Sequence, residues 1–224
     1  MKRIALFGTS ADPPTAGHQA IVSWLSQRYD WVAVWAADNP FKSHQTPLEH
    51  RAAMLRLLIS EIISIPARDL DSGHGCTSHQ FTCRFVDPPR QNIGFHPELS
   101  SFRTLETVEK AKEFWGPDAE FTLVIGSDLV SQLLRWHRVE DLLRQVQVLV
   151  VPRPGYAIEE SSLERVRQLG GNIAIADLTG PAVSSTAYRE NGEVEALTPP
   201  IEEYIHREHL YKCQDVPKKR LQIR

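Results

Sequence analysis

The chain has 224 residues, of which 24% are charged and 42% hydrophobic, and its formal net charge is −3 at pH 7. A chain of this length can bury a large core without disulfides, and its odd number of cysteines, three, favours a reducing compartment. The near-neutral charge argues against a nucleic-acid binder, because neutralising phosphates requires clustered Lys and Arg. The sequence has no signal-peptide segment and no apolar run of bilayer length, so we expect a cytoplasmic protein that does not bind membranes.

Short apolar runs alternate with segments of helical periodicity along most of the chain. The runs rich in β-branched and aromatic residues are predicted to be strands, namely Lys2–Phe7, Trp31–Ala36, Phe121–Ile125, Gln147–Val151 and Asn172–Ala176. Helical spacing of apolar residues predicts helices over Gly17–Arg28, over Leu48–Ile63 and from Leu105 to Trp115.

This alternation predicts an α/β fold with right-handed crossovers and a doubly wound parallel sheet. In such sheets ligands bind beyond the carboxyl ends of the strands. We therefore expect the site in the loops that follow Phe7, Ala36, Ile125 and Val151.

Two segments do not follow the alternation. Residues 66–97 contain four prolines and little periodicity, which predicts an irregular insertion. Within it the side chains of His74, Cys76, His79 and Cys83 are of zinc-ligand type. Their spacing matches no common zinc module and favours a polar surface loop, so we assign no metal site, although the sequence does not decide the question. Residues 214–224 form a basic tail without apolar periodicity, which we expect to be flexible.

A small-residue loop follows the first predicted strand. Gly8, Thr9 and Ser10 lack bulk, so backbone N–H groups there can approach a phosphate closely. Thr15 and His18 lie three residues apart at the amino end of the next predicted helix, an end that favours negative charge. The alternative is an ordinary turn and helix cap with a packed histidine, but the combination favours a phosphate site.

A second cluster of polar residues precedes a helical stretch near the end of the chain. Ser184, Ser185 and Thr186 are candidates to cap that helix, and their hydroxyls could also hold a triphosphate. Arg189 lies one turn into the helix and could add a charge-assisted contact. Alone, this pattern is an ordinary helix start; together with the first loop it indicates a nucleotide site.

These and further segments resemble the bacterial nicotinate mononucleotide adenylyltransferases of the nucleotidyltransferase superfamily. Thr15–His18 resembles the superfamily's T/H-x-G-H signature, and Val183–Arg189 resembles its I-S-S-T-x-x-R signature. The more specific matches are to G-x-D, W-H-R, V-V-x-R-P-G-Y and E-H-R-x-x-M, at 126–128, 136–138, 150–156 and 49–54. Residues 39–44 are similar to the family's N-P-x-x-K segment, and residues 104–108 resemble its T-x-[DE]-T-L segment. The resemblance runs from residue 1 to about Tyr211 and omits residues 66–97.

The resemblance implies a Rossmann-like, three-layer α/β/α nucleotidyltransferase domain over residues 1–213. It also implies transfer of AMP from ATP to nicotinate mononucleotide, giving deamido-NAD and pyrophosphate.

The residues expected to be catalytic, through contacts with the phosphates of ATP, are Thr15, His18 and Arg189. The other residues expected to bind ATP are Gly8, Thr9, Ser10, Gly17, Gly126, Asp128, Ser184, Ser185 and Thr186, of which Asp128 would bind the ribose. The residues expected to bind the mononucleotide are Lys42, His44, Arg51, Thr104 and Trp136, with Trp136 stacked on the pyridine ring. Mg²⁺ is expected to arrive with ATP, without dedicated protein ligands.

Three positions depart from the family pattern. Thr15 stands where this family usually has histidine, and Thr9 and Ala11 replace its usual second glycine and phenylalanine. The departures at Thr9 and Ala11 leave a non-catalytic nucleotide-binding relative as an alternative to the enzyme. Nicotinamide mononucleotide or phosphopantetheine as the acceptor are further alternatives, and the sequence leaves open whether the chain is a monomer or a homo-oligomer.

Overall fold

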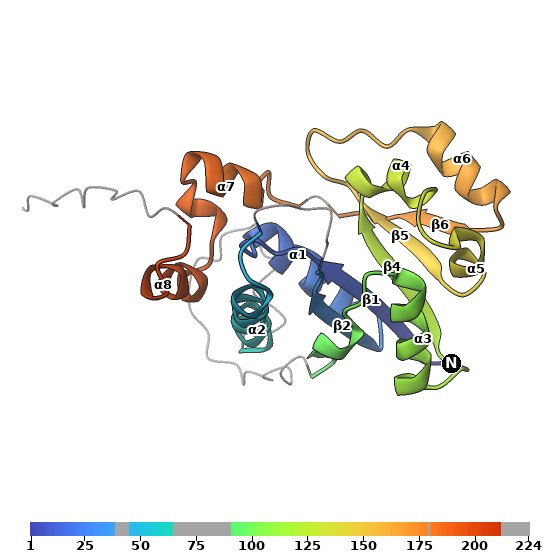
Figure 1. The fold of residues 1–224 in the computed structure, drawn as a ribbon, viewed down its shortest axis with the longest axis horizontal. Helices are drawn as coiled ribbons and strands as arrows, with labels where there is room; N and C mark the ends of the chain where they lie inside the picture. Colours follow the sequence, from blue (N-terminus) through green and yellow to red (C-terminus); the bar gives the residue numbers. More distant parts are fainter. Residues whose placement is uncertain (39–44, 65–90, 179, 212–224) are drawn as a thin grey trace, which may run out of the picture.

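The computed structural model describes residues 1–38, 45–64, 91–178 and 180–211, and these residues form a parallel six-stranded sheet covered by helices on both faces (Figure 1). The strand order is β3-β2-β1-β4-β5-β6, and every neighbouring pair is parallel. The strands are β1 (Arg3–Thr9), β2 (Trp31–Ala36), β3 (Ile93–Phe95), β4 (Glu120–Gly126), β5 (Gln147–Val151) and β6 (Asn172–Ile175). This sheet confirms the predicted α/β fold and the five predicted strands.

The sixth strand corrects one prediction. Residues 66–97 were expected to be irregular throughout, but Ile93–Phe95 form β3, which pairs with β2 at the edge of the sheet. Three residues are too short a run for alternation to be visible in the sequence. Residues 65–90, and with them His74, Cys76, His79 and Cys83, lie outside the described residues.

Helices connect the strands in the expected manner. The longer ones are α1 (Ala16–Ser26), α2 (Leu48–Ser64), α3 (Thr104–Trp115), α6 (Glu160–Gln168) and α8 (Pro199–Arg207). The shorter ones are α4 (Val130–Leu133), α5 (Val139–Leu143), α7 (Ser185–Asn191) and the 3-10 turns η2 (Pro97–Leu99), η3 (Ser127–Leu129) and η4 (Val194–Ala196). Among the described residues, no helix is both long and apolar enough to cross a bilayer.

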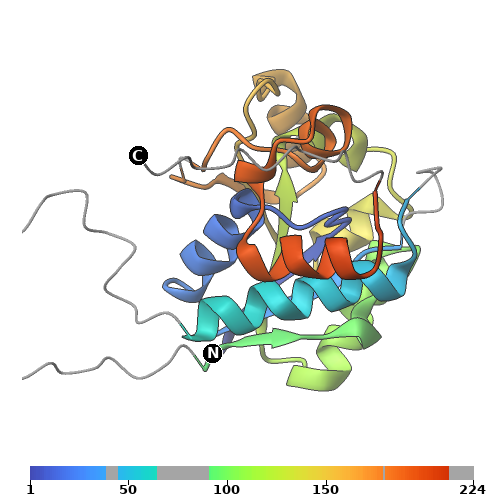
Figure 2. The ribbon, with the colours of Figure 1, turned by 90° about the vertical axis from the view of Figure 1, so that its left-hand side faces the viewer.

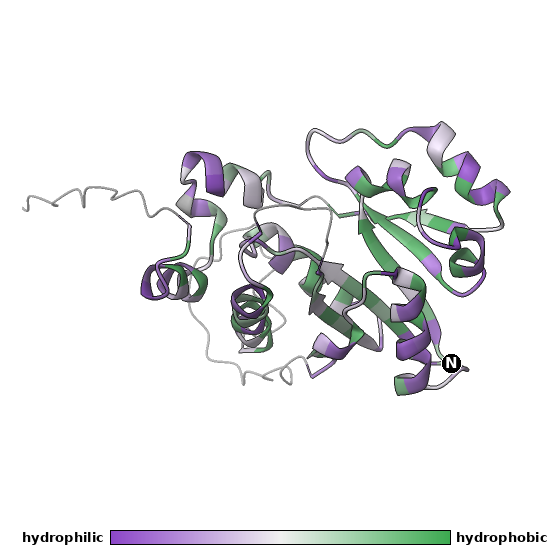
Figure 3. Ribbon diagram, in the orientation of Figure 1, coloured by the Kyte–Doolittle hydropathy of each residue, from purple (hydrophilic) through white to green (hydrophobic). Residues whose placement is uncertain are grey.

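The two faces of the sheet are packed by different helices because side chains alternate along each strand. In β1, Ile4 and Leu6 join a core under α3, α4, α5 and α6, whereas Ala5 and Phe7 join a core under α1, α2 and α8. Apolar residues accordingly fill the strands while polar residues cover the outer sides of the helices (Figure 3). In the second core, α8 lies alongside α2 (Figure 2), so the C-terminal part of the chain packs on its N-terminal half.

The strand order reverses at β1. The chain moves from β1 outward through β2 to β3 and then returns to place β4 on the other side of β1. The connections leave the carboxyl ends of β1 and β4 in opposite directions, which opens a crevice where open α/β sheets bind their ligands. The ends of these two strands, Thr9 and Gly126, are both residues predicted to bind ATP.

Candidate active site

The two predicted nucleotide-binding segments meet beyond the carboxyl end of β1. The Ser185 hydroxyl donates a hydrogen bond of 2.7 Å to the Pro13 carbonyl, and the Arg189 guanidinium donates to the Asp12 carbonyl. A methyl group added to Gly17 would lie 3.7 Å from the side chain of Val183. Segments separated by more than 170 residues in the sequence are therefore held in direct contact by hydrogen bonds.

His18 lies at the centre of the first segment. Its Nδ1 accepts the Thr15 backbone N–H at 3.1 Å and lies 3.0 Å from the Thr15 hydroxyl, while its Nε2 lies 3.0 Å from the Thr9 hydroxyl. Burial, assisted by the positive charge of Arg153, lowers the pKa of His18 from 6.5 to about 4. At neutral pH the ring is therefore uncharged, and because Nδ1 accepts, the proton is on Nε2, which is a donor.

Thr15 is buried and precedes the first residue of α1 in extended conformation, so it occupies the N-cap position. The second segment has the same arrangement, since Ser184 precedes α7 and its hydroxyl accepts the Ala187 N–H at 3.0 Å. This confirms the predicted helix cap at Ser184. Thr186, in the first turn of α7, accepts from Arg189 at 3.3 Å, so the hydroxyl and the guanidinium lie side by side.

Gly8 is required by the packing beneath the loop. A Cβ at this position would lie 2.5 Å from the ring of Trp35, a buried residue of β2. The loop therefore passes over the indole with no space for a side chain. Ala11 follows at a φ of +44° and is buried, so the chain bends here through the left-handed region that non-glycine residues seldom adopt.

The end of β4 carries an ion pair that the sequence reasoning missed. Asp128 Oδ2 lies 2.9 Å from Arg153 Nη1, while Asp128 Oδ1 is buried and has no hydrogen-bond partner among the described residues. Ser127 accepts the Arg153 N–H at 3.0 Å and donates to the Tyr156 carbonyl at 3.0 Å. A Cβ on Gly126 would collide with both Asp128 and Arg153, so glycine is needed here. The V-V-x-R-P-G-Y segment was the available signal for Arg153.

Arg51 connects the loops after β1 and β2 to α2. Its side chain is 2% exposed and donates to the carbonyls of Thr46, Ser10 and Ala37 at 2.8, 3.0 and 2.7 Å. These hydrogen bonds position the loops, and binding of the mononucleotide by Arg51 stays a prediction.

The remaining mononucleotide candidates lie in other parts of the structure. Thr104 is half-buried at the start of α3, and Trp136 is half-buried after α4, where it packs on the core beneath α4 and α5. A cavity of about 390 Å³, lined by Asp38, Leu48, Ser100, Ser101 and Phe102, opens beside the carboxyl end of β2 and just before Thr104. This cavity therefore lies on the side of the sheet where the ligand site is predicted, at the carboxyl ends of the strands. Lys42 and His44 lie outside the described residues.

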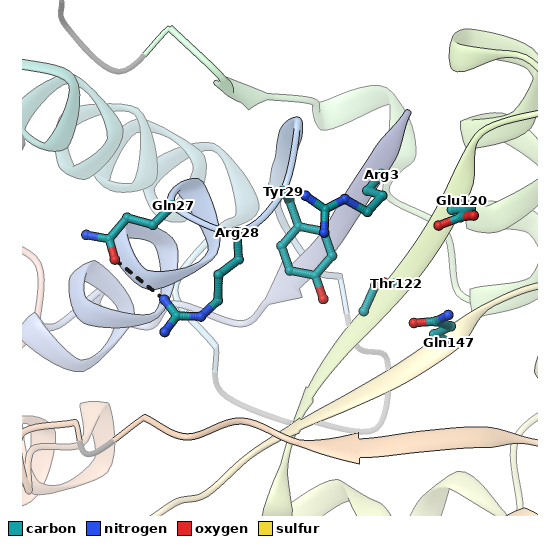
Figure 4. Close-up of a pocket in the computed structure, with 7 residues that line it drawn as sticks. All are labelled: Arg3, Gln27, Arg28, Tyr29, Glu120, Thr122 and Gln147. Atoms are coloured by element: carbon teal, nitrogen blue, oxygen red, sulfur yellow. Dashed lines mark hydrogen bonds between the residues drawn. The ribbon is translucent and has the colours of Figure 1, made fainter. Parts of the chain in front are cut away.

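A cavity of about 440 Å³ lies at the opposite edge of the sheet (Figure 4). Its lining residues belong to or lie near the amino ends of the strands and the end of α1, namely Arg3, Gln27, Arg28, Tyr29, Glu120, Thr122 and Gln147. None of them belongs to the motifs described above. The larger of these two cavities is therefore not the candidate site.

Among the residues that the structure describes, no group of three or more His, Cys, Asp or Glu side chains is arranged to hold a metal ion. The carboxylate of Asp12, which lies in the loop after β1, accepts from Tyr211 Oη at 2.6 Å and from the Thr46 N–H at 3.3 Å. Both of its oxygens are therefore already engaged by protein donors. Neither Asp12 nor Tyr211 was singled out from the sequence, because their partners lie far along the chain.

Comparisons with known proteins identify relatives over nearly the whole chain. The family model described as cytidylyltransferase-like matches residues 6–191. A Synechocystis protein named probable nicotinate-nucleotide adenylyltransferase is 36% identical over 222 residues, covering 94% of this chain and 99% of the relative. The nicotinate-nucleotide adenylyltransferase of Bacillus subtilis is 24% identical over 222 residues, covering 95% of this chain and 100% of the relative.

Solved structures support the fold. The Plasmodium falciparum nicotinic acid mononucleotide adenylyltransferase complexed with NaAD has a TM-score of 0.70 at 20% identity, covering 94% of this chain and 98% of that one. The same enzyme complexed with APC has a TM-score of 0.67, also at 20% identity, with the same coverage of both chains. From the match over residues 6–191 and the full-length relatives, this chain belongs to the cytidylyltransferase-like family.

Proposed function

We propose that this chain transfers AMP from ATP to nicotinate mononucleotide, giving deamido-NAD and pyrophosphate. The observation that carries the proposal is the contact between the His18 segment and the 184–189 segment, made by Ser185 on Pro13 and by Arg189 on Asp12. This contact brings the segment that carries the His18 imidazole against the segment that carries the hydroxyls of 184–186 and the Arg189 guanidinium, groups that suit binding of a triphosphate. The full-length relatives named nicotinate-nucleotide adenylyltransferase support the choice of acceptor.

The chemistry needs no general base. A phosphate oxygen of the mononucleotide, already ionised at pH 7, attacks the α-phosphorus of ATP. The bond from the α-phosphorus to the bridging oxygen breaks, and pyrophosphate leaves with the electron pair. The protein's contribution is then to hold the two phosphates in line and to neutralise the charge that develops.

His18 and Arg189 are suited to different parts of that task. The neutral imidazole presents the Nε2 proton, which bonds the Thr9 hydroxyl at 3.0 Å and would pass to a phosphate oxygen of bound ATP. An uncharged donor can contact the α-phosphate of ATP without stabilising the bound substrate more than the transition state. Arg189 carries a guanidinium and lies beside Thr186, so we assign it to the leaving pyrophosphate, where negative charge accumulates.

Asp128 is the proposed ribose acceptor. Its Oδ1 has no partner among the described residues, and Arg153 fixes Oδ2. A ribose hydroxyl would donate to this carboxylate once Arg153 and Asp128 adjust to the nucleotide. Trp136 and Thr104 remain the proposed contacts of the pyridine ring and its substituent.

We propose that Mg²⁺ enters as MgATP. Asp12, the carboxylate in the loop after β1, has both oxygens engaged by Tyr211 and Thr46. The ion would then be held by phosphate oxygens and water, which suits its preference for octahedral oxygen ligands. Its chemical contribution would be to neutralise the charge of the pyrophosphate as it leaves.

The test is to incubate the full chain with MgATP and nicotinate mononucleotide and to measure pyrophosphate and dinucleotide together. We expect both products in equal amounts, with kcat/KM higher for nicotinate mononucleotide than for nicotinamide mononucleotide or phosphopantetheine. Equal values for the two mononucleotides would refute the acid preference. Absence of pyrophosphate in the presence of bound ATP would instead favour the non-catalytic relative.

Substitution of His18 tests the site. His18→Ala should lower kcat by at least about 10²-fold, as loss of a transition-state phosphate contact does, with the fold retained. His206→Ala, which changes an exposed histidine of α8, is the matched control and should leave kcat unchanged. An unaltered rate in His18→Ala would refute the proposed role.

A further inference from the structure

Tyr211 connects the end of the described chain to the nucleotide loop. The residue follows α8, and its hydroxyl donates a hydrogen bond of 2.6 Å to Asp12 Oδ1, 199 residues earlier in the sequence. Asp12 is only 4% exposed, so this bond satisfies a carboxylate that water cannot reach. The ring of Tyr211 packs edge-on against Tyr188 in α7, with centroids 5.8 Å apart.

Asp12 in turn joins three segments. Its Oδ2 accepts the Thr46 N–H from the stretch before α2, and its backbone carbonyl accepts from Arg189 in α7. The position of Asp12 therefore sets the position of the guanidinium that we assign to the pyrophosphate. Tyr188 precedes Arg189 in α7, so the Tyr211 ring also contacts the helix that carries this guanidinium.

Tyr211 is suited to remain a donor. Burial and the neighbouring Asp12 carboxylate raise the pKa of its phenol far above the usual value of 10. The hydroxyl therefore stays protonated wherever Asp12 is ionised, and the bond is charge-assisted. Nothing in the sequence around Tyr211 indicates this role, since the contact depends on the packing of α8 against α2.

We propose that Tyr211 is a positioning residue of the ATP site: its hydroxyl fixes Asp12, and Asp12 fixes both the loop after β1 and the guanidinium of Arg189. This inference rests on the proposed function, because it assigns the positioned guanidinium to the phosphates of ATP. Removing the hydroxyl leaves Asp12 Oδ1 buried without a donor, so the loop shifts to hydrate the carboxylate. Arg189 then loses its fixed carbonyl and binds ATP less well.

The substitution that tests this is Tyr211→Phe, which keeps the ring and removes only the hydroxyl. Loss of a hydrogen bond to a charged group predicts a rise on the order of tenfold in KM for ATP. KM for nicotinate mononucleotide should stay within about twofold, a difference that corresponds to well under 1 kcal/mol. A general loss of folding would affect the binding of both substrates. A rise in KM for ATP alone therefore indicates a positioning role for the Tyr211 hydroxyl and not a loss of stability.

Tyr204→Phe is the matched control. Tyr204 lies in α8, and its hydroxyl is 3.0 Å from His50 Nδ1, a contact in which Asp12 takes no part. This variant removes a tyrosine hydroxyl from the same C-terminal packing and should leave KM for both substrates unchanged. Melting temperatures of the two variants show whether their stability losses are comparable.

Direct binding keeps this inference separate from the proposed function. The affinity of each variant for a non-hydrolysable ATP analogue is measured by calorimetry, which requires no turnover. If the parent binds the analogue but forms no deamido-NAD, the proposed function fails while the role of Tyr211 can still be tested. If Tyr211→Phe does not fold, Asp12→Asn takes its place, because the amide keeps the shape and loses the charge; it should show the same ATP-selective loss.

Three outcomes would overturn the inference. They are an unchanged affinity for ATP in Tyr211→Phe, equal losses for both substrates, and an equal ATP defect in Tyr204→Phe. Where Asp12→Asn is used, normal ATP affinity in that variant would do the same.

Discussion

Arg153 and Asp128 form an ion pair of 2.9 Å beyond the end of β4, and the charge of the same arginine acts on His18 in the first turn of α1. One cation thus acts on two candidate site residues that lie far apart in the sequence. It holds the proposed ribose acceptor and contributes to keeping neutral the imidazole that we propose to bind phosphate.

Replacing Arg153 with glutamine should raise the pKa of His18. Removing a positive charge makes protonation of the imidazole less unfavourable, while burial, the larger cause, still holds the pKa below 6.5. The measurement is an NMR titration of the His18 ring. Arg138→Gln, which removes an exposed arginine paired with Asp141, is the control and should leave the titration unchanged. A His18 titration that is identical in parent and Arg153→Gln would contradict the coupling.

The pKa of His18 also predicts how stability depends on pH. The unfolded histidine takes up a proton near 6.5, whereas the folded one does so only near about 4. Between these values the unfolded state binds more protons, so acidification lowers the free energy of unfolding. Compared with His18→Gln, the parent should lose stability progressively from pH 6.5 to about 4, with no further relative loss below that. Denaturant unfolding across this range measures it, and a constant difference between the two proteins would disprove the shift.

Gly8→Ala should destabilise the protein. The added methyl would lie 2.5 Å from the Trp35 ring, in a core with no space to relax. Overpacking of this kind costs about 1–3 kcal/mol of unfolding free energy. Gly180→Ala is the control, because nothing lies within 4 Å of the added group there, and its effect should be within about 0.5 kcal/mol. Comparable stability of the two variants in denaturant titrations would refute the packing argument.

Arg51→Met should act mainly on stability. The substitution leaves the carbonyls of Ser10, Ala37 and Thr46 without their buried donor. Such losses cost at least about 2 kcal/mol in total. Arg56→Met, on the exposed side of the same helix, removes only stacking on Phe95 and should cost about 1 kcal/mol or less. A fall in affinity for the mononucleotide without loss of stability would instead support the prediction that Arg51 contacts the ligand.

Most of the fold could be predicted because its signals are local. Apolar runs and helical periodicity located five strands and the helices α1, α2 and α3, but not α6 or α8. Ser184, which caps α7, was one of three cap candidates that neighbouring residues indicated. β3 was missed because three residues carry too little periodicity. The side of the sheet on which we expect ligands to bind could be predicted from the parallel strand order alone. Open parallel sheets bind their ligands beyond the carboxyl ends of the strands.

The candidate site was predictable only where its residues form short motifs. Thr15 and His18 contact each other within one helical turn, so their spacing was informative. Arg51 also lies in a motif, but the motif does not reveal whether its side chain points toward a ligand or into the loops. Only the packing of α2 against the ends of β1 and β2 directs it inward.

The sequence by itself determined the alternation of strands and helices, the parallel sheet and the two polar segments that we propose for a nucleotide site. These features depend on side-chain periodicity and on residues a few positions apart, which the chain carries wherever it folds. Only the tertiary structure decided that Ser185 meets Pro13, that Arg153 pairs with Asp128 and that Tyr211 reaches Asp12. Those contacts exist because β1 lies between β2 and β4 and because α8 packs on α2. Partners so far apart in the sequence come within hydrogen-bonding distance only when the elements that carry them pack together.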